Sequence, residues 1–302
     1  MPFPPLRDSV SVNELASLKR NFLTPSSFAP VIRRLPLLLA FFILPLTAHA
    51  AELKIAAKAA VLMNAQTGNI LWAKDKDFPL PPASTAKILT ASVVLDQSRI
   101  EDLVTIPAEA LRVSGANTNL EAGEKLTVGD SLHAMLLGSG NDAAVTLALH
   151  AGKSFDAFVE RMNEKARKLG AARSRFFNPT GMPHPKQVTT AHDLALIAKS
   201  ALENSDLRKI VSAKTYGWKS ARWQGTLKNS NHLLSTYPGA IGVKTGNTRE
   251  AGYCLVAAAR RGPQTYIAVI LKSQEKAVWQ DAKKLLDYGF KHASLSPVYF
   301  AR

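Results

Sequence analysis

Strand-like segments in this sequence lie at the two ends of the region that follows residue 50, and helix-like segments fill the space between them. Residues Ala59–Asn64 and 69–73 are typical of two strands joined by a short turn. Three further strand candidates are residues 241–245, 253–259 and 266–271. Strands of one sheet lie side by side, so the two ends of the region have to meet. We therefore predict an α/β (α+β) fold in which both termini build one antiparallel sheet, with a helical subdomain inserted between them.

Helical periodicity marks the middle of the chain and its last segment. Ser84 opens one such pattern, directly after Pro81-Pro82-Ala83. Thr190 opens another, and Asp193 three residues later makes a variant of the capping box. The other predicted helices are residues 132–137, 143–150, 155–169 and 279–288. The inserted subdomain is therefore expected to be mostly helical.

The first fifty residues are typical of a leader with a signal peptide. Arg33-Arg34 precede an apolar run over residues 35–46, and Ala48-His49-Ala50 offers small residues at a cleavage site. We predict cleavage after Ala50 and export to the periplasm or another extracytoplasmic part of the cell envelope. A helix over the apolar run would reach about 18 Å, less than the ~30 Å hydrocarbon core. Membrane attachment is expected only if the leader stays uncleaved, which is the alternative.

Residues 51–302 are long enough for one large core, and no internal repeat or low-complexity linker divides them. Only residues 291–302 remain after the last predicted helix, so we expect no second C-terminal domain. Cys254 is the one cysteine, so no disulfide can form within the chain. We expect it to be a buried, unreactive thiol.

The charge balance favours anionic partners. The chain has 38 Lys and Arg against 23 Asp and Glu, a net charge of +15. No basic block with interleaved aromatic residues indicates nucleic-acid binding, and the predicted export also argues against it. The remaining interpretations are an anionic polymer of the cell envelope, or basic residues merely scattered over a solvated surface.

Three short strings in a fixed order carry the chemistry. They are Ser84-Thr85-Ala86-Lys87, Ser139-Gly140-Asn141 and Lys244-Thr245-Gly246. Each string alone arises often by chance. Their order, and their predicted settings at a helix start, an interhelical loop and a strand, indicate one site for acyl transfer through a serine.

The first string provides a nucleophile and a base. Ser84 and Lys87 are three residues apart and would lie on one helix face. A serine hydroxyl is a weak nucleophile until a base takes its proton. Lysine can act as that base when burial or a nearby cation lowers its pKa, and Lys244 is the candidate cation.

The other strings provide the rest of the site. Ser139 can pass a proton between Lys87 and the leaving nitrogen, and Asn141 can hold the substrate peptide. A strand at 244–246 can pair with an extended peptide, and Gly246 leaves room for it. The backbone N–H groups of Ser84 and Asn247 are candidates for an oxyanion hole.

Other catalytic classes lack their sequence signals. None of the seven histidines stands in a Gly-x-Ser-x-Gly setting, which disfavours a Ser-His-Asp triad. No His-Glu-x-x-His motif or similar cluster indicates a zinc site, so we expect neither a metal nor a cofactor.

With these motifs the sequence resembles the serine D-Ala-D-Ala carboxypeptidases, the low-molecular-mass penicillin-binding proteins. The resemblance covers residues 59–290 and includes further segments at residues 82–84, 229–234, 244–248, 251–255 and 285–290. It implies the β-lactamase/transpeptidase-like fold for residues 51–302. It also implies removal of the terminal D-alanine from peptidoglycan stem peptides, and covalent inhibition by β-lactams.

The resemblance also implies a role for each motif residue. Ser84 would be acylated and Lys87 would be the base, with Ser139 assisting catalysis. The substrate pocket would be completed by Asn141, Lys244, Thr245, Gly246 and Asn247.

One departure from the family pattern leaves open whether the enzyme cuts at a chain end or at a crosslink. Many members carry an arginine just before the terminal helix that helps to bind the substrate's carboxylate. This chain has Val278-Trp279-Gln280-Asp281 there, with Lys276 nearby. A D,D-endopeptidase that cuts peptidoglycan crosslinks is therefore the alternative to a carboxypeptidase.

Two more distant alternatives are a class A β-lactamase and a non-catalytic envelope-binding protein. The first needs a glutamate that activates the deacylating water, and no convincing Glu-x-x-x-Asn lies between the second and third strings. The intact set of Ser84, Lys87, Ser139 and Lys244 argues against the second.

Overall fold

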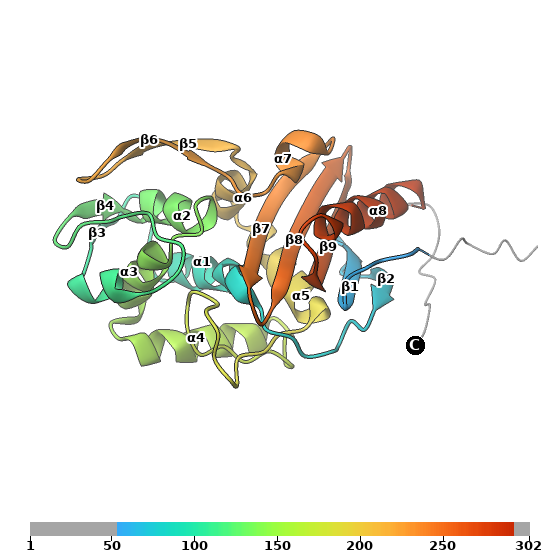
Figure 1. Ribbon diagram of the computed structural model, residues 1–302, viewed down its shortest axis with the longest axis horizontal. Coiled ribbons are helices and arrows are strands. Elements are labelled where there is room, and N and C mark those ends of the chain that lie inside the picture. The colour runs from blue at the N-terminus through green and yellow to red at the C-terminus, as the bar shows by residue number, and fades with distance from the viewer. Residues whose placement is uncertain (1–52, 293–302) are drawn as a thin grey trace, which may run out of the picture. The chain divides into compact units, whose positions relative to one another are not determined.

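The computed structural model describes residues 53–292 (Figure 1). The predicted leader, its cleavage site after Ala50 and residues 293–302 lie outside the described residues. Within residues 53–292, no helix has the length and apolar character needed to cross a membrane.

One five-stranded antiparallel sheet joins the two ends of the described chain. Its strand order is β2-β1-β9-β8-β7, so β1 and β2 pair with strands from the other end through β9. The strands are β1 (Ala59–Asn64), β2 (Ile70–Lys74), β7 (Ala240–Thr248), β8 (Gly252–Arg261) and β9 (Gln264–Ser273). The predicted sheet built from both termini is confirmed, and β7 lies at its edge.

The central strands are buried on both faces because helices cover both sides of the sheet. Alternate residues of β8 enter two different cores: Leu255 and Ala257 enter one, Val256 and Ala258 the other. The first core is closed by α8 (Ala277–Lys291), the predicted amphipathic terminal helix. Figure 1 shows α8 lying across the sheet, with α5 (Ala191–Glu203) packed on β1 and β9. Near-continuous apolar strands are the expected result of this two-sided burial.

The inserted lobe is helical, as predicted. Its helices are η1 (Ala83–Ala86), α1 (Lys87–Leu95), α2 (Val128–Leu136), α3 (Asn141–Gly152), α4 (Phe155–Lys168), α5 and α6 (Ser205–Ser212). Thr190 caps α5 by accepting a hydrogen bond from the Asp193 N–H. The Asp193 carboxylate accepts from the Arg173 N–H and the Ser174 hydroxyl. Asp193 therefore ties the segment before α5 to that helix.

Several short elements were not predicted. They are β3 (Leu103–Thr105), η2 (Ala108–Arg112), β4 (Lys125–Thr127), β5 (Thr215–Lys219), β6 (Gln224–Lys228), α6 and α7 (Leu233–Thr236). The β5–β6 hairpin runs beside α2 (Figure 1). Trp218 and Leu227 are buried beneath it. The Tyr216 hydroxyl donates to Asp130 on α2 at 2.6 Å, which fastens the hairpin to the lobe.

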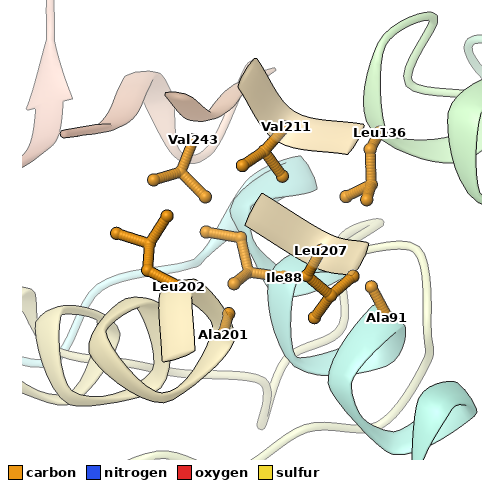
Figure 2. A pocket seen from close by; sticks show the side chains of 8 residues that line it. All are labelled: Ile88, Ala91, Leu136, Ala201, Leu202, Leu207, Val211 and Val243. Carbon is orange, nitrogen blue, oxygen red and sulfur yellow. The ribbon is translucent and has the colours of Figure 1, made fainter. Parts of the chain in front are cut away.

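A small apolar cavity lies where the lobe meets the sheet. Figure 2 shows its lining side chains, which come from α1, α2, α5, α6 and β7. Two of them, Ile88 and Val243, directly follow or precede Lys87 and Lys244 in the sequence. The protein behind the two lysines is therefore apolar. Cys254 on β8 is buried as predicted, and burial raises the pKa of its thiol to about 11.

Candidate active site

The three predicted strings converge where the edge strand β7 meets the helical lobe. Gly246 on β7 lies against the nucleophile's backbone, because a Cβ on Gly246 would stand 2.9 Å from the Ser84 nitrogen. Any side chain at this position would displace Ser84. The close approach of these two segments therefore explains why the third string ends in glycine.

Ser84 lies in the 3₁₀ turn η1, and α1 begins three residues later at Lys87. The helix that was predicted to begin at Ser84 thus begins one turn later. Ala83 adopts a left-handed φ of +47°, which is unusual for alanine. Gly181, also left-handed at +81°, packs so closely that a Cβ there would overlap the Ala83 carbonyl oxygen. The loop around Gly181 thus holds the turn that carries the nucleophile.

Lys87 is fully buried and makes three hydrogen bonds. Its Nζ lies 3.0 Å from Ser84 Oγ, 2.7 Å from Asn141 Oδ1 and 2.7 Å from the Thr180 carbonyl oxygen. The amide and peptide oxygens can only accept hydrogen bonds, whereas the Ser84 hydroxyl can also donate. A neutral amine would give its two N–H groups to the two carbonyl oxygens. Its lone pair would then face the Ser84 hydroxyl, as a general base requires.

The charge state of Lys87 is set by its surroundings. Burial is the largest effect and lowers the pKa of Lys87 well below its ordinary value, and the charge of Lys244 lowers it further. The carboxylate of Asp142 opposes both effects. The site therefore favours the neutral amine that can take a proton from Ser84.

Lys244 is 1 % exposed and donates from Nζ to Ser139 Oγ at 3.1 Å and to the Thr245 carbonyl oxygen at 3.0 Å. Burial lowers the pKa of Lys244 to about 7. The sequence suggested a relay from Ser139 to Lys87, but the hydrogen bond that Ser139 makes in this structure goes to Lys244. Ser139 has a left-handed φ of +63° in the turn between α2 and α3, which aims its hydroxyl into the site.

Asn141 was predicted to hold the substrate, and its amide is already engaged within the protein. Oδ1 accepts from Lys87, and Nδ2 donates to the Ser114 carbonyl oxygen at 2.6 Å. Its backbone N–H donates to the Ala116 carbonyl oxygen at 2.7 Å. Asn141 therefore orients Lys87 and fastens residues 113–120, a segment called the strap below.

Thr245 and Asn247 lie along β7 on either side of Gly246. The Thr245 hydroxyl is 2.7 Å from the Ser230 hydroxyl, and Ser230 is exposed. The Asn247 side chain is exposed, one residue beyond the contact with Ser84. All eight predicted residues thus lie on the segments that meet at this junction.

A family model described as D-alanyl-D-alanine carboxypeptidase matches residues 46–275, most of the chain. The chain belongs to this family. A D-alanyl-D-alanine carboxypeptidase of Streptomyces sp. (strain K15) is 40 % identical over 255 residues, covering 78 % of this chain and 88 % of the relative. The carboxypeptidase DacF of Bacillus subtilis is 36 % identical, and the match covers 82 % of this chain and 66 % of DacF.

Solved structures support the same family and confirm the predicted fold. The crystal structure of the Streptomyces K15 DD-transpeptidase is 38 % identical to this chain, with a TM-score of 0.75. The match covers 79 % of this chain and 98 % of that one. The resemblance inferred from the three motifs is therefore confirmed at the level of family and fold.

The departure from the family pattern that the sequence showed at Val278 falls in the first turn of α8. Where the family arginine was expected, Val278 is 2 % exposed and packs in the core beneath α8. Its neighbour Trp279 is half-buried and stacks on His232, with ring centroids 4.9 Å apart. An aromatic stack thus lies next to the buried Val278.

Three residues of the site were not singled out from the sequence. Thr180 acts through its carbonyl oxygen, which any residue type has, so the sequence gave no signal. Ser230 belongs to a segment that resembles the family, but nothing in the sequence connected it to Thr245. Asp142 follows Asn141 directly, and its buried carboxylate accepts from the Thr118 N–H and hydroxyl. An acidic residue next to Asn141 was the only signal that the sequence offered for Asp142.

Metal-binding groups are not assembled here. Within residues 53–292, no three His, Cys, Asp or Glu side chains are placed to hold an ion. The donors and acceptors around Ser84 are lysine, hydroxyl and amide groups, which suit proton transfer and acyl transfer.

Proposed function

We propose that this protein is a serine D,D-carboxypeptidase that removes the terminal D-alanine from peptidoglycan stem peptides. The observation that carries the proposal is the environment of Lys87. Its Nζ lies 3.0 Å from Ser84 Oγ, and its other two partners are oxygens that can only accept hydrogen bonds. The names of the family relatives support the choice of substrate.

Acylation follows from this geometry. Ser84 Oγ attacks the carbonyl carbon that precedes the terminal residue, and Lys87 Nζ takes the hydroxyl proton. The backbone N–H groups of Ser84 and Asn247 are proposed to stabilise the oxyanion. The C–N bond then breaks, and the proton that Lys87 took from Ser84 passes through the Ser139 hydroxyl to the leaving nitrogen, so Lys87 becomes neutral again. Lys244 holds Ser139 in place by its hydrogen bond. The product is an ester on Ser84.

Deacylation repeats these steps with water. Lys87 takes a proton from the water molecule, hydroxide adds to the ester carbonyl, and Ser84 leaves with its proton restored. A β-lactam would acylate Ser84 in the same way. Its leaving nitrogen stays tethered to the acyl group through the opened ring, so the adduct is expected to be long-lived.

The predicted leader supports an activity in the cell envelope, where peptidoglycan lies. We propose that the chain is exported and that its substrate is reached in the periplasm or an equivalent extracytoplasmic space. The net charge of +15 is compatible with an anionic polymer as substrate.

The proposed nucleophile can be tested with Ser84→Ala. We expect loss of covalent labelling by fluorescent penicillin and a fall in D-alanine release by about 10³-fold or more, because the acyl-enzyme cannot form. The substrate is a defined muropeptide monomer with a pentapeptide stem, and products are measured by mass spectrometry. Thr226→Ala, on the exposed side of β6, is the matched control. Labelling that survives in Ser84→Ala would show that the nucleophile has been misassigned.

A D,D-endopeptidase is the second candidate, and the buried Val278 favours it because no arginine binds a chain-terminal carboxylate at that position. A D-alanyl-D-alanine endopeptidase of Pseudomonas aeruginosa is 32 % identical over 208 residues and covers 67 % of this chain. Incubation with a crosslinked muropeptide dimer, in parallel with the monomer, separates the two activities. Dimer cleavage without D-alanine release from the monomer would replace the first proposal by the second.

A further inference from the structure

A pocket of about 240 Å³ lies between the junction of α6 with β5 and the short helix α7. Its lining includes Lys214, Asn231 and His232, together with residues of α7. None of these side chains takes part in the acyl-transfer site described above. The volume is enough for a peptide side chain or a single residue.

The pocket adjoins the acyl-transfer site through one residue. Ser230 lies between Asn229 and Asn231, both of which line the pocket. The Ser230 hydroxyl is 2.7 Å from the Thr245 hydroxyl on β7. Hydrogen bonds fix the segment, because Asn229 accepts from the Asn231 N–H and donates to the Ala213 carbonyl oxygen. The wall between pocket and site is therefore a rigid turn.

The direction of β7 places the pocket on the leaving-group side. Gly246 lies beside Ser84, whereas Thr245 and α7 come earlier along the chain. β7 is the edge strand, so a substrate can add to it as an antiparallel strand. Such a peptide runs opposite to β7, and the part after the scissile bond points toward Thr245, Ser230 and the pocket. Ser139, through which the leaving nitrogen is protonated, and its hydrogen-bond partner Lys244 lie on the same side.

The chemistry of the lining suits a carboxylate. Lys214 is exposed and forms no ion pair within the part of the chain that the structure describes. The exposed His232 ring is held in place by its stack on Trp279, with the ring planes 12° apart. Asn231 is 2 % exposed, and its Nδ2 has no hydrogen-bond partner among the described residues. No Asp or Glu lines the pocket.

We propose that this pocket is a subsite for the peptide on the amine side of a stem-peptide crosslink, held by its carboxylate. The proposal rests on the proposed function at Ser84. In the cleavage step the crosslinking C–N bond breaks, an ester forms on Ser84, and the leaving amine of the second peptide takes its proton through Ser139. A leaving alanine ends near Thr245, whereas a second peptide extends past Ser230 into the pocket.

The test compares two substrates in the full chain. The double variant Lys214→Gln/His232→Gln removes the cationic group and the imidazole, and both side chains are exposed. We expect kcat/KM for a crosslinked muropeptide dimer to fall about tenfold, mainly through KM, as expected for the loss of a charge-assisted hydrogen bond. D-Alanine release from the monomer and the rate of penicillin labelling are expected to stay within about twofold of the wild type, since an alanine leaving group stops short of the pocket.

Lys219→Gln, an exposed lysine of β5 outside the pocket, is the matched control for loss of one positive charge. The subsite proposal is overturned if dimer cleavage is unchanged in the double variant, if both substrates decline in parallel, or if the wild type leaves the dimer intact. A wild type that cleaves the dimer but releases no D-alanine from the monomer would instead refute the carboxypeptidase proposal and leave the subsite standing.

Discussion

At the scale of single residues, Lys87 and Lys244 are two buried amines whose charges repel. Lys87 has to be neutral to accept the Ser84 proton, and burial with the charge of Lys244 holds its pKa well below the ordinary value. Burial brings the pKa of Lys244 to about 7. We therefore expect the acylation rate to rise with pH as Lys87 loses its proton, and to decline above about pH 7 as Lys244 loses its charge.

Lys244→Gln tests this coupling. Without the neighbouring charge, Lys87 holds its proton to a higher pH, so the acid limb of the rate profile should move to higher pH and the alkaline limb should vanish. Stopped-flow acylation by penicillin over a range of pH values measures both limbs. Lys228→Gln, at an exposed position of β6, is the control. An acid limb that stays in place would mean that the charge of Lys244 does not act on Lys87.

The sequence allowed the residues with distinctive side chains to be predicted, but not the contacts between them. Ser84, Lys87 and Lys244 could be found because spacing and residue type indicate a nucleophile, a base and a cation. The partner of Ser139 could not, since the choice between Lys87 and Lys244 depends on a left-handed turn at Ser139 itself. The Thr180 carbonyl oxygen carries no signal in its side chain.

At the scale of elements, the strap of residues 113–120 is held from both sides. On the inside, Asp142 accepts from the Thr118 N–H at 2.9 Å and from its hydroxyl at 3.0 Å. On the outside, the indole N–H of Trp223, the residue directly before β6, donates to the Thr118 carbonyl oxygen at 2.9 Å. The strap in turn accepts hydrogen bonds from Asn141, which orients Lys87. The β5–β6 hairpin therefore supports the base through two intermediate contacts.

Trp223→Phe tests this support. The change removes the N–H group and leaves the Thr118 carbonyl oxygen without that partner, at a cost of about 1 kcal/mol. We expect slower penicillin acylation with a melting temperature only slightly lowered. Trp218→Phe on β5 is the matched control, because within residues 53–292 the Trp218 indole nitrogen has no hydrogen-bond partner. Equal effects of the two substitutions on acylation would argue that ring packing, and not the hydrogen bond, matters.

The hairpin itself shows why some elements escaped prediction. β5 and β6 are five residues each and contain Gly217 and Gly225, which weaken any strand pattern. The hairpin is stabilised because Trp218 and Leu227 pack on the lobe, and because the Tyr216 hydroxyl donates a hydrogen bond to Asp130. β8 and β9, by contrast, are ten residues each and contain the unbroken apolar runs 253–259 and 266–271, so the sequence alone indicated them. Greater length and longer apolar runs therefore made β8 and β9 predictable, whereas β5 and β6 were not.

At the scale of the whole molecule, the fold depends on bringing distant ends of the chain together. One sheet built from both termini was predicted from the placement of strand patterns. The structure joins them by pairing β1 with β9, together with a contact that no pattern indicated. Asp281 on α8 is 1 % exposed and accepts from the Ala56 N–H at 3.1 Å and the Ala57 N–H at 2.9 Å. A carboxylate from the last helix thus fixes the segment that leads into the first strand.

Asp281→Ala should therefore lower the free energy of unfolding by about 2–3 kcal/mol, because the buried Ala57 N–H loses a charged acceptor. Urea denaturation followed by tryptophan fluorescence measures the change. Asp287→Ala removes an exposed carboxylate from the same helix, which accepts a hydrogen bond from the Tyr237 hydroxyl and lies 3.9 Å from the exposed Arg261 guanidinium. It should cost less than about 1 kcal/mol. The acylation rate of the folded fraction should be unchanged in both, since neither residue contacts the segments around Ser84. If Asp281→Ala were no more costly than Asp287→Ala, the sheet pairing of β1 with β9 alone would account for the closure of the fold.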